Sequence, residues 1–344
     1  MKESKIGYYF IVMASVIVVL AGIKSAIEIL VPFLLALFIA IVLSPMYEFL
    51  RKKKIPDALA LVIVIMGFVV FLVSIASLIG TSVQDFSANI NTYNMKLNAY
   101  YESLSTYLQN FGLELPVEEI RNMLNSKQIM LFVSSIIKSM GSMFTNGFVI
   151  LLTVIFMLLE SESFSKKIDI ADGNKDTIIQ ITSILDKIKE YMMLKALISL
   201  FTGFVVWIAL LFIGTDYAFL WAVLAFLLNF IPNIGSIIAA VPAVLISLVQ
   251  LGVFNAFLVV ALYTSINIVI GSIIEPKVMG KGLGLSTLVV FLSLLFWGWL
   301  LGMVGMLLSI PLTIMAKIIF SENQNTKWIS VLLGSGDNLE NKVK

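Results

Sequence analysis

The sequence predicts an all-α fold: a polytopic transmembrane helical bundle with broken or re-entrant helices in the C-terminal third and an amphipathic helical insert outside the membrane. Composition is the first reason, because 60% of the 344 residues are apolar and 13% are charged, against about 45–50% and about 25% in soluble domains. Long apolar runs are the second. The third is that eleven of the 21 glycines lie within 196–316.

The apolar runs give the membrane segments in order, since a helix needs about 20 apolar residues to cross a bilayer. The last run is too long for one ordinary span and is interrupted by glycines and Pro311, so a helical hairpin is preferred there to a single tilted helix. Its glycines, four or three residues apart, are expected to pack helices closely: Gly298, Gly302 and Gly305. The runs are Tyr8–Ile23, Ile29–Phe49, Ala58–Gly80, Ser142–Leu159, Ala196–Ile213, 217–231, 234–250, 253–274 and 286–316.

Basic residues predict the orientation, because loops rich in Lys and Arg stay in the cytoplasm. The run Arg51–Lys54 is the strongest anchor, and threading from it places both termini and residues 161–195 inside. The prediction is a multi-pass inner-membrane protein in six parts. These are N-terminal spans (1–84), an extracytoplasmic insert (85–140), a span (141–160), a cytoplasmic amphipathic segment (161–195), a C-terminal region with broken helices (196–320) and a cytoplasmic tail (321–344).

The insert carries an apolar seam at heptad spacing. One interpretation is an amphipathic hairpin lying on the protein or at the membrane interface. The second is a contact between subunits of a homo-oligomer, and the third is a substrate-capturing domain. The seam residues are Phe86, Ile90, Tyr93, Leu97, Tyr100, Leu104, Tyr107 and Phe111.

Several chemistries are excluded by residues that the chain lacks. It has no Cys and no His, so thiolate chemistry, the commonest metal ligands and the usual neutral-pH base are absent. It also has no phosphate-binding loop. We expect no enzyme activity, no cofactor and no metal site. The expected partners are the lipid bilayer and a small-molecule or ion substrate, not nucleic acid.

Residues 229–236 form the first predicted break in the C-terminal third. Proline removes a backbone donor and glycine permits a tight reversal. The alternatives are a plain hairpin between short helices or an element that lines a transport path, because irregular backbone at membrane depth survives only in protein or beside water. The candidate path residues are Asn229, Pro232, Asn233, Gly235 and Ser236.

The second predicted break covers 271–284. Glu275 ends a long apolar helix, and an intramembrane carboxylate is by default a candidate site. It either pairs with Lys277 or Lys281, or binds a cation and gates the path. Asn267 and Tyr263 precede it on roughly the same face and are expected to line the same path. The expected hinges are Gly271, Pro276, Gly280, Gly282 and Gly284. Asp216, the other acidic residue of this region, is expected to cap the following helix.

Three motifs resemble signatures of the autoinducer-2 exporter family of bacterial membrane proteins. The first is Ile-Pro-Asn-Ile-Gly-Ser at 231–236, which is similar to the family's Ile-Pro-Tyr-Ile-Gly-Pro. The second is Ile-Glu-Pro-Lys-Val-Met-Gly-Lys-Gly-Leu-Gly-Leu at 274–285. The third is the ending from Trp297 to Lys317. The resemblance implies an exporter or secondary transporter. Within that family, some members are linked to export of a quorum signal and others to exchange of sodium or lithium for protons, so the resemblance implies one of these activities.

The sequence therefore favours a secondary transporter or exporter of a small solute, working by alternating access through helices broken at glycine and proline. A sodium (lithium)/proton antiporter is the alternative within the same family. A non-transporting membrane scaffold is the alternative from another class, and a channel is a third, since broken helices also build pores.

Overall fold

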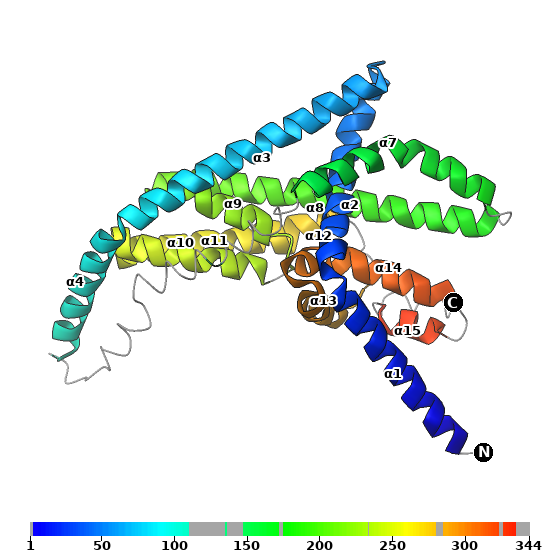
Figure 1. Ribbon diagram of the computed structural model, residues 1–344. Helices are drawn as coiled ribbons and strands as arrows, with labels where there is room; N and C mark the ends of the chain where they lie inside the picture. The colour runs from blue at the N-terminus through cyan, green and yellow to red at the C-terminus, as the bar shows by residue number, and fades with distance from the viewer. Residues whose placement is uncertain are drawn as a thin grey trace. The chain divides into compact units, whose positions relative to one another are not determined.

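The computed structural model describes residues 3–109, 135, 147–171, 175–232, 234–279, 285–322 and 326–334. Within these ranges every regular element is a helix (Figure 1), apart from an isolated antiparallel bridge between Leu285 and Gly334. Helices are expected here, because only a helix or a closed barrel satisfies its own backbone groups in a bilayer. The predicted all-α class is confirmed.

Five helical stretches in the described ranges are long and apolar enough to cross a membrane. Shorter apolar helices, such as Phe10–Ser25 and Gly147–Glu160, accompany them. The predicted polytopic membrane protein is therefore confirmed. The five stretches are Ile27–Lys52, Asp57–Ala88, Asp186–Ile213, Val253–Val278 and Thr287–Leu307.

The chain forms two compact units, each assembled from separate stretches of sequence. Unit 1 comprises Met1–Val64, Ser142–Met193 and Gly282–Lys344, and unit 2 comprises Ile65–Gly141 and Leu194–Lys281. Two helices run across the division: α3 (Asp57–Ala88) and α8 (Lys175–Ile213).

Unit 1 is organised around α2 (Ile27–Lys52), which packs against α7 (Gly147–Ala171) and α13 (Thr287–Leu307). α1 (Glu3–Ser25) contacts both α2 and α13. The buried residues of α2 and α7 recur at steps of three and four, which is the spacing of one helix face. They include Leu35, Ile39, Leu43, Ile150, Val154 and Leu158.

The run 286–316 reverses direction at Gly302, the one residue of α13 with non-helical φ and ψ (67° and −147°). A Cβ added at Gly305 would lie 2.0 Å from the carbonyl oxygen of Trp297, although a straight helix would separate these residues by about 12 Å. Trp297 also donates a 2.9 Å hydrogen bond to Thr313 on α14 (Ser309–Glu322). This segment is a helical hairpin. The short helix α15 (Lys327–Leu332) follows it and packs on α14.

Unit 2 places α10 (Gly235–Leu251) between α9 (Ala218–Leu228) and α11 (Val253–Ile266). α4 (Ile90–Gln109) also packs on α10. Small residues on α10, Ala239 and Ala243, are fully buried and allow close packing. α11 continues without interruption into the π-helix η1 (Asn267–Ile274) and α12 (Glu275–Met279).

α8 is a single helix of 39 residues. The cytoplasmic segment expected at 161–195 and the span expected from Ala196 onward are therefore joined without a break at Lys195. The last turns of α7 and the first turns of α8 occupy most of 161–195, and the polar turn at 172–174 lies outside the described residues. Continuity of α8 matters for the site, because it carries polar side chains from its basic half into the apolar half.

Candidate functional site

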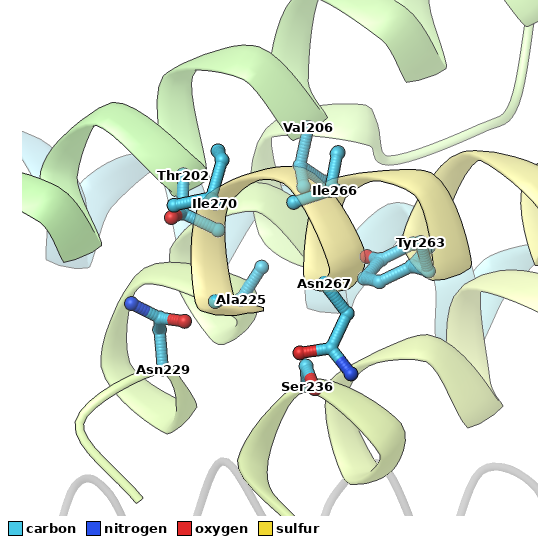
Figure 2. A pocket seen from close by; sticks show the side chains of 10 residues that line it. Thr202, Val206, Ala225, Asn229, Ser236, Tyr263, Ile266, Asn267 and Ile270 are labelled. Carbon is cyan, nitrogen blue, oxygen red and sulfur yellow. The ribbon is translucent and has the colours of Figure 1, made fainter. Parts of the chain in front are cut away.

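Unit 2 contains a small cavity lined from four helical segments: α8, α9, the start of α10 and the α11–η1 helix. Figure 2 shows Thr202 and Asn229 on one side, with Tyr263 and Asn267 projecting from the opposite helix. The free space suffices for about one water molecule. The lining residues are Thr202, Val206, Ala225, Asn229, Ser236, Tyr263, Ile266, Asn267, Ile270 and Gly271.

The turn between α9 and α10 brings two of the polar residues to the cavity. α9 ends at Leu228 and α10 begins at Gly235. A Cβ at Gly235 would lie 1.8 Å from the carbonyl oxygen of Leu228, so a larger residue would force the turn open. The predicted break is present here, and glycine is required for space rather than for a left-handed φ. Asn229 closes α9 and Ser236 opens α10, so both side chains lie at the turn.

Asn229 is fixed by a hydrogen bond to α8. Its amide nitrogen donates to the hydroxyl of Ser199 over 3.0 Å. Ser199 is fully buried, so this bond satisfies a polar pair inside the unit and positions the Asn229 side chain at the cavity wall.

The opposite wall is helical through Met279, so the chain does not break at Gly271 or Pro276, and the rest of the predicted break, 280–284, lies outside the described residues. Residues Asn267–Ile274 form a π-helix, and the backbone N–H of Glu275 donates to the carbonyl of Ile270 five residues earlier. This wider pattern accommodates Gly271, and the segment stays helical through Pro276 although proline has no N–H to donate to the preceding turn. π-Helical segments frequently occur at functional sites. Here the segment directs Asn267, Ile270 and Gly271 toward the cavity.

Tyr263 presents a buried hydroxyl to the cavity. The residue is 5% exposed, and its hydroxyl has no hydrogen-bond partner in the described structure. A buried polar group without a partner costs about 1–3 kcal/mol. A polar guest in the cavity would satisfy it.

Glu275 lies beyond the cavity and is paired with Lys195. Its Oε1 is 2.5 Å from the Lys195 ammonium, and the two side chains are 20% and 5% exposed. The sequence suggested Lys277 or Lys281 as partners. Lys277 is exposed, and Lys281 lies outside the described residues. The sequence did not predict Lys195 as the partner of Glu275, because Lys195 ends a basic segment and such a lysine usually anchors a helix at the membrane surface.

The cavity therefore unites four predicted path residues, Asn229, Ser236, Tyr263 and Asn267. It does not include Glu275, Pro232 or Gly235. Asn233, Gly280, Gly282 and Gly284 lie outside the described residues. Thr202 and Ser199 were missed. Together with Lys195 they form a polar stripe at steps of four and three on α8. This helical spacing is the sequence pattern that could have predicted them.

Two glycines of the C-terminal hairpin lie at close approaches. A Cβ at Gly298 would lie 2.7 Å from the Met306 side chain, and one at Gly305 would collide with the Trp297 carbonyl. Gly302 has open space around it and a φ of +67°, so it forms the turn itself rather than a packing surface.

Part of the heptad seam packs inside the chain. Phe86 and Tyr93 are 2% and 4% exposed, and both contact Tyr217: its ring stacks edge-on against Phe86, and its hydroxyl lies 3.2 Å from that of Tyr93. These two side chains are therefore buried within the chain itself. The side chains of Ile90, Leu97, Tyr100 and Leu104 lie outside the described residues.

Asp216 is not the helix cap that the sequence predicted. Tyr217 precedes α9 instead, and no side chain caps it. The Asp216 carboxylate accepts a 2.7 Å hydrogen bond from Tyr93, while its backbone N–H donates to Gln250 over 2.7 Å. Lys96 donates to the Gln250 carbonyl over 3.2 Å. These bonds hold α4 on the α8–α9 loop and the end of α10.

Membrane-length apolar helices around a small internal cavity with a few polar side chains fit a polytopic membrane transport protein. The chain belongs to the AI-2E transporter family, whose model, described as "AI-2E family transporter", matches residues 13–324. The AI-2 transport protein TqsA of Escherichia coli (strain K12) is 39% identical over 324 residues, which cover 94% of each chain.

Two further relatives are similar to this chain over nearly their whole length. A transport protein of Haemophilus influenzae is 42% identical over 334 residues, covering 93% of this chain and 94% of the relative. YhhT of Escherichia coli (strain K12) is 37% identical over 337 residues, covering 97% of each. The names of both assign transport and give no solute. The chain is thus a multi-pass inner-membrane transporter rather than an enzyme, and the relatives favour transport over the scaffold alternative.

Proposed function

We propose that the protein is a secondary transporter or exporter of a small polar solute, and that the unit 2 cavity is part of the solute path. The observation that carries this proposal is the buried Tyr263 hydroxyl without a partner, on a cavity that Asn229 and Asn267 also line. Every polar group on the lining is neutral, which suits hydrogen bonding to an uncharged solute. Autoinducer-2 is the first solute to test, because one relative is named for its transport.

Alternating access is the mechanism proposed for this path. The cavity has room for about one water molecule, so an organic solute requires the surrounding helices to separate. The α9–α10 turn and the π-helix are the elements best suited to move, because their backbones depart from regular α-helical bonding. Inward- and outward-facing states would expose the same polar residues in turn.

The proposal is tested with Tyr263→Phe and a matched control, Ser247→Ala. Both changes remove a buried hydroxyl without a partner, and Ser247 is not among the cavity residues. Both variants should keep or slightly raise the unfolding temperature. Only Tyr263→Phe should reduce solute flux into proteoliposomes, by about three- to tenfold if one hydrogen bond to the solute is lost. Equal flux in both variants would remove the cavity from the path.

The sodium (lithium)/proton antiporter remains the alternative, and its support is the carboxylate of Glu275 inside a candidate membrane span. Flux under imposed sodium and proton gradients separates it from solute export. A single-channel conductance would instead indicate a pore.

A homo-oligomer with cytoplasmic termini completes the proposal. Its support is the remaining heptad seam of the insert and the basic run at 51–54. Native mass spectrometry of the detergent-solubilised protein tests the assembly, and a monomer alone in the spectrum would refute it.

A further inference from the structure

We propose that Lys195 is the resident cation of Glu275 and thereby determines the cation specificity of transport. Its ammonium occupies the position that Na⁺ or Li⁺ would take on this carboxylate. The ion pair is short, at 2.5 Å, and both side chains are largely withdrawn from the surface. Neither group has a role in the cavity chemistry derived above.

The pair belongs to the same two helices that form the cavity. On α8, Lys195 is followed by Ser199, Thr202 and Val206 at steps of four, three and four, and all four residues are buried. On the opposite helix, Glu275 follows Asn267 and Gly271 at steps of four. Lys195 therefore lies about 10 Å along α8 from Thr202, at one end of the face that lines the cavity.

Burial explains why a cation must stay at this position. A carboxylate inside a membrane span is costly unless an opposite charge pairs with it or a proton neutralises it. Removing one partner of a buried pair leaves an uncompensated charge, whereas removing both charges is often tolerated. A transporter that used Glu275 for a dissolved cation would have to neutralise the carboxylate with a proton in each empty state, as the antiporter alternative requires.

Lys195 has an advantage over a dissolved ion because it is tethered. A covalently attached group acts at an effective concentration of millimolar or more, and it remains when external sodium falls. Na⁺ would have to lose its hydration shell and displace the ammonium. Glu275 is therefore closed to Na⁺ and Li⁺ while Lys195 is present.

The experiment measures sodium binding and flux with purified protein. Lys195→Met and Lys195→Gln remove the ammonium and keep a side chain of similar length, while Lys195→Met/Glu275→Gln removes both charges. Lys189→Met is the matched control, because Lys189 pairs with Glu48 at 3.5 Å and both of these side chains are well exposed. Radioactive ²²Na⁺ binding is measured in detergent, and solute flux is measured in proteoliposomes with sodium or choline.

The wild type and Lys189→Met should bind no ²²Na⁺ above background and show equal flux in sodium and choline. The single Lys195 variants should bind Na⁺, and sodium should raise their flux about fivefold or more, the lower range of coupling between two sites. The doubly neutral variant should lose both responses. Folded Lys195 variants that do not bind Na⁺ would overturn the proposal.

The wild type provides a second route to refutation that does not depend on the folding of a single variant. Sodium binding by the wild type that disappears in the doubly neutral variant would show that Lys195 does not exclude the ion. The role in transport rests on the proposed function, but the binding measurement requires no solute. Unchanged flux in Tyr263→Phe would therefore remove the cavity from the path while leaving the test of Lys195 intact.

Discussion

Tyr93 and Asp216, 123 positions apart in sequence, are joined by a 2.7 Å hydrogen bond in which the Tyr93 hydroxyl donates. Burial, followed by the hydrogen bonds to Tyr217 and Asp216, raises the pKa of Tyr93 far above its ordinary value. The phenol is thus a permanent donor at neutral pH. It links α4 to the loop before α9.

Tyr93→Phe should release α4 by removing that donor. A hydrogen bond to a charged group contributes about 1.5–3 kcal/mol, so the unfolding temperature should fall and hydrogen exchange in α4 should accelerate. Thr106→Ala is the control, because the exposed Thr106 hydroxyl donates within its own helix, to the carbonyl of Glu102. Similar exchange in the two variants would show that the Tyr93–Asp216 bond does not hold α4.

The same bond predicts a pH dependence. Because the folded-state pKa is raised, the contribution of Tyr93 to stability is complete below the unfolded pKa of about 10 and is lost as the pH rises above it. The wild type should therefore lose stability faster than Tyr93→Phe above about pH 10. Parallel stability curves for the two proteins would contradict the raised pKa.

Gly235→Ala should open the turn between α9 and α10. The new Cβ would lie 1.8 Å from a backbone carbonyl that cannot rotate away, and overpacking of this kind costs about 1–3 kcal/mol or more. Flux should fall together with stability, because the turn carries Asn229 and Ser236. Gly67→Ala is the control. Its Cβ would meet nothing within 4 Å, so it should be neutral or stabilising by about 0.5–1 kcal/mol. Thermal unfolding in detergent measures both, and equal stability would exclude the steric argument.

The residues of the cavity were predictable where a polar side chain interrupts an apolar run. Asn229, Ser236, Tyr263 and Asn267 were found in this way. Lys195 was not, because a lysine at the end of a basic segment is usually a membrane anchor. Its role depends on Glu275, 80 positions away, and no local pattern encodes that pairing.

The π-helix shows a second limit of local reasoning. Glycine and proline at 271 and 276 are breakers in an α-helix, and the sequence predicted a break there. Bonds to the fifth residue instead keep the segment helical. The break at 229–234 was predictable, because proline and glycine there lie between two short apolar arms rather than within one long helix.

Alanine substitutions at the glycines of the C-terminal hairpin should reduce stability by different amounts, in an order that the structure predicts. Gly302→Ala places an L-residue at φ +67° and ψ −147°, a region that only glycine adopts readily, with open space around it, which costs about 1–3 kcal/mol. Gly305→Ala adds a collision with the Trp297 carbonyl and should cost more, about 3 kcal/mol. Gly22→Ala, with no neighbour within 4 Å, is the control. Unfolding followed by tryptophan fluorescence gives the ranking, and a larger loss for Gly302→Ala would show that backbone strain, not contact, dominates the turn.

The predicted orientation can be tested by labelling introduced cysteines, because the chain has no native cysteine that would also react. Lys53→Cys and Thr106→Cys both introduce exposed thiols, one at the basic run after α2 and the other on the polar insert. Lysine-rich segments resist translocation, so an impermeant maleimide should label Thr106→Cys in intact spheroplasts. It should label Lys53→Cys only after the membrane is permeabilised. The reverse pattern would place the basic run outside and invert the threading of every span. Labelling of both positions in intact spheroplasts would mean that the two lie on the same side, which would remove α3 as a membrane crossing.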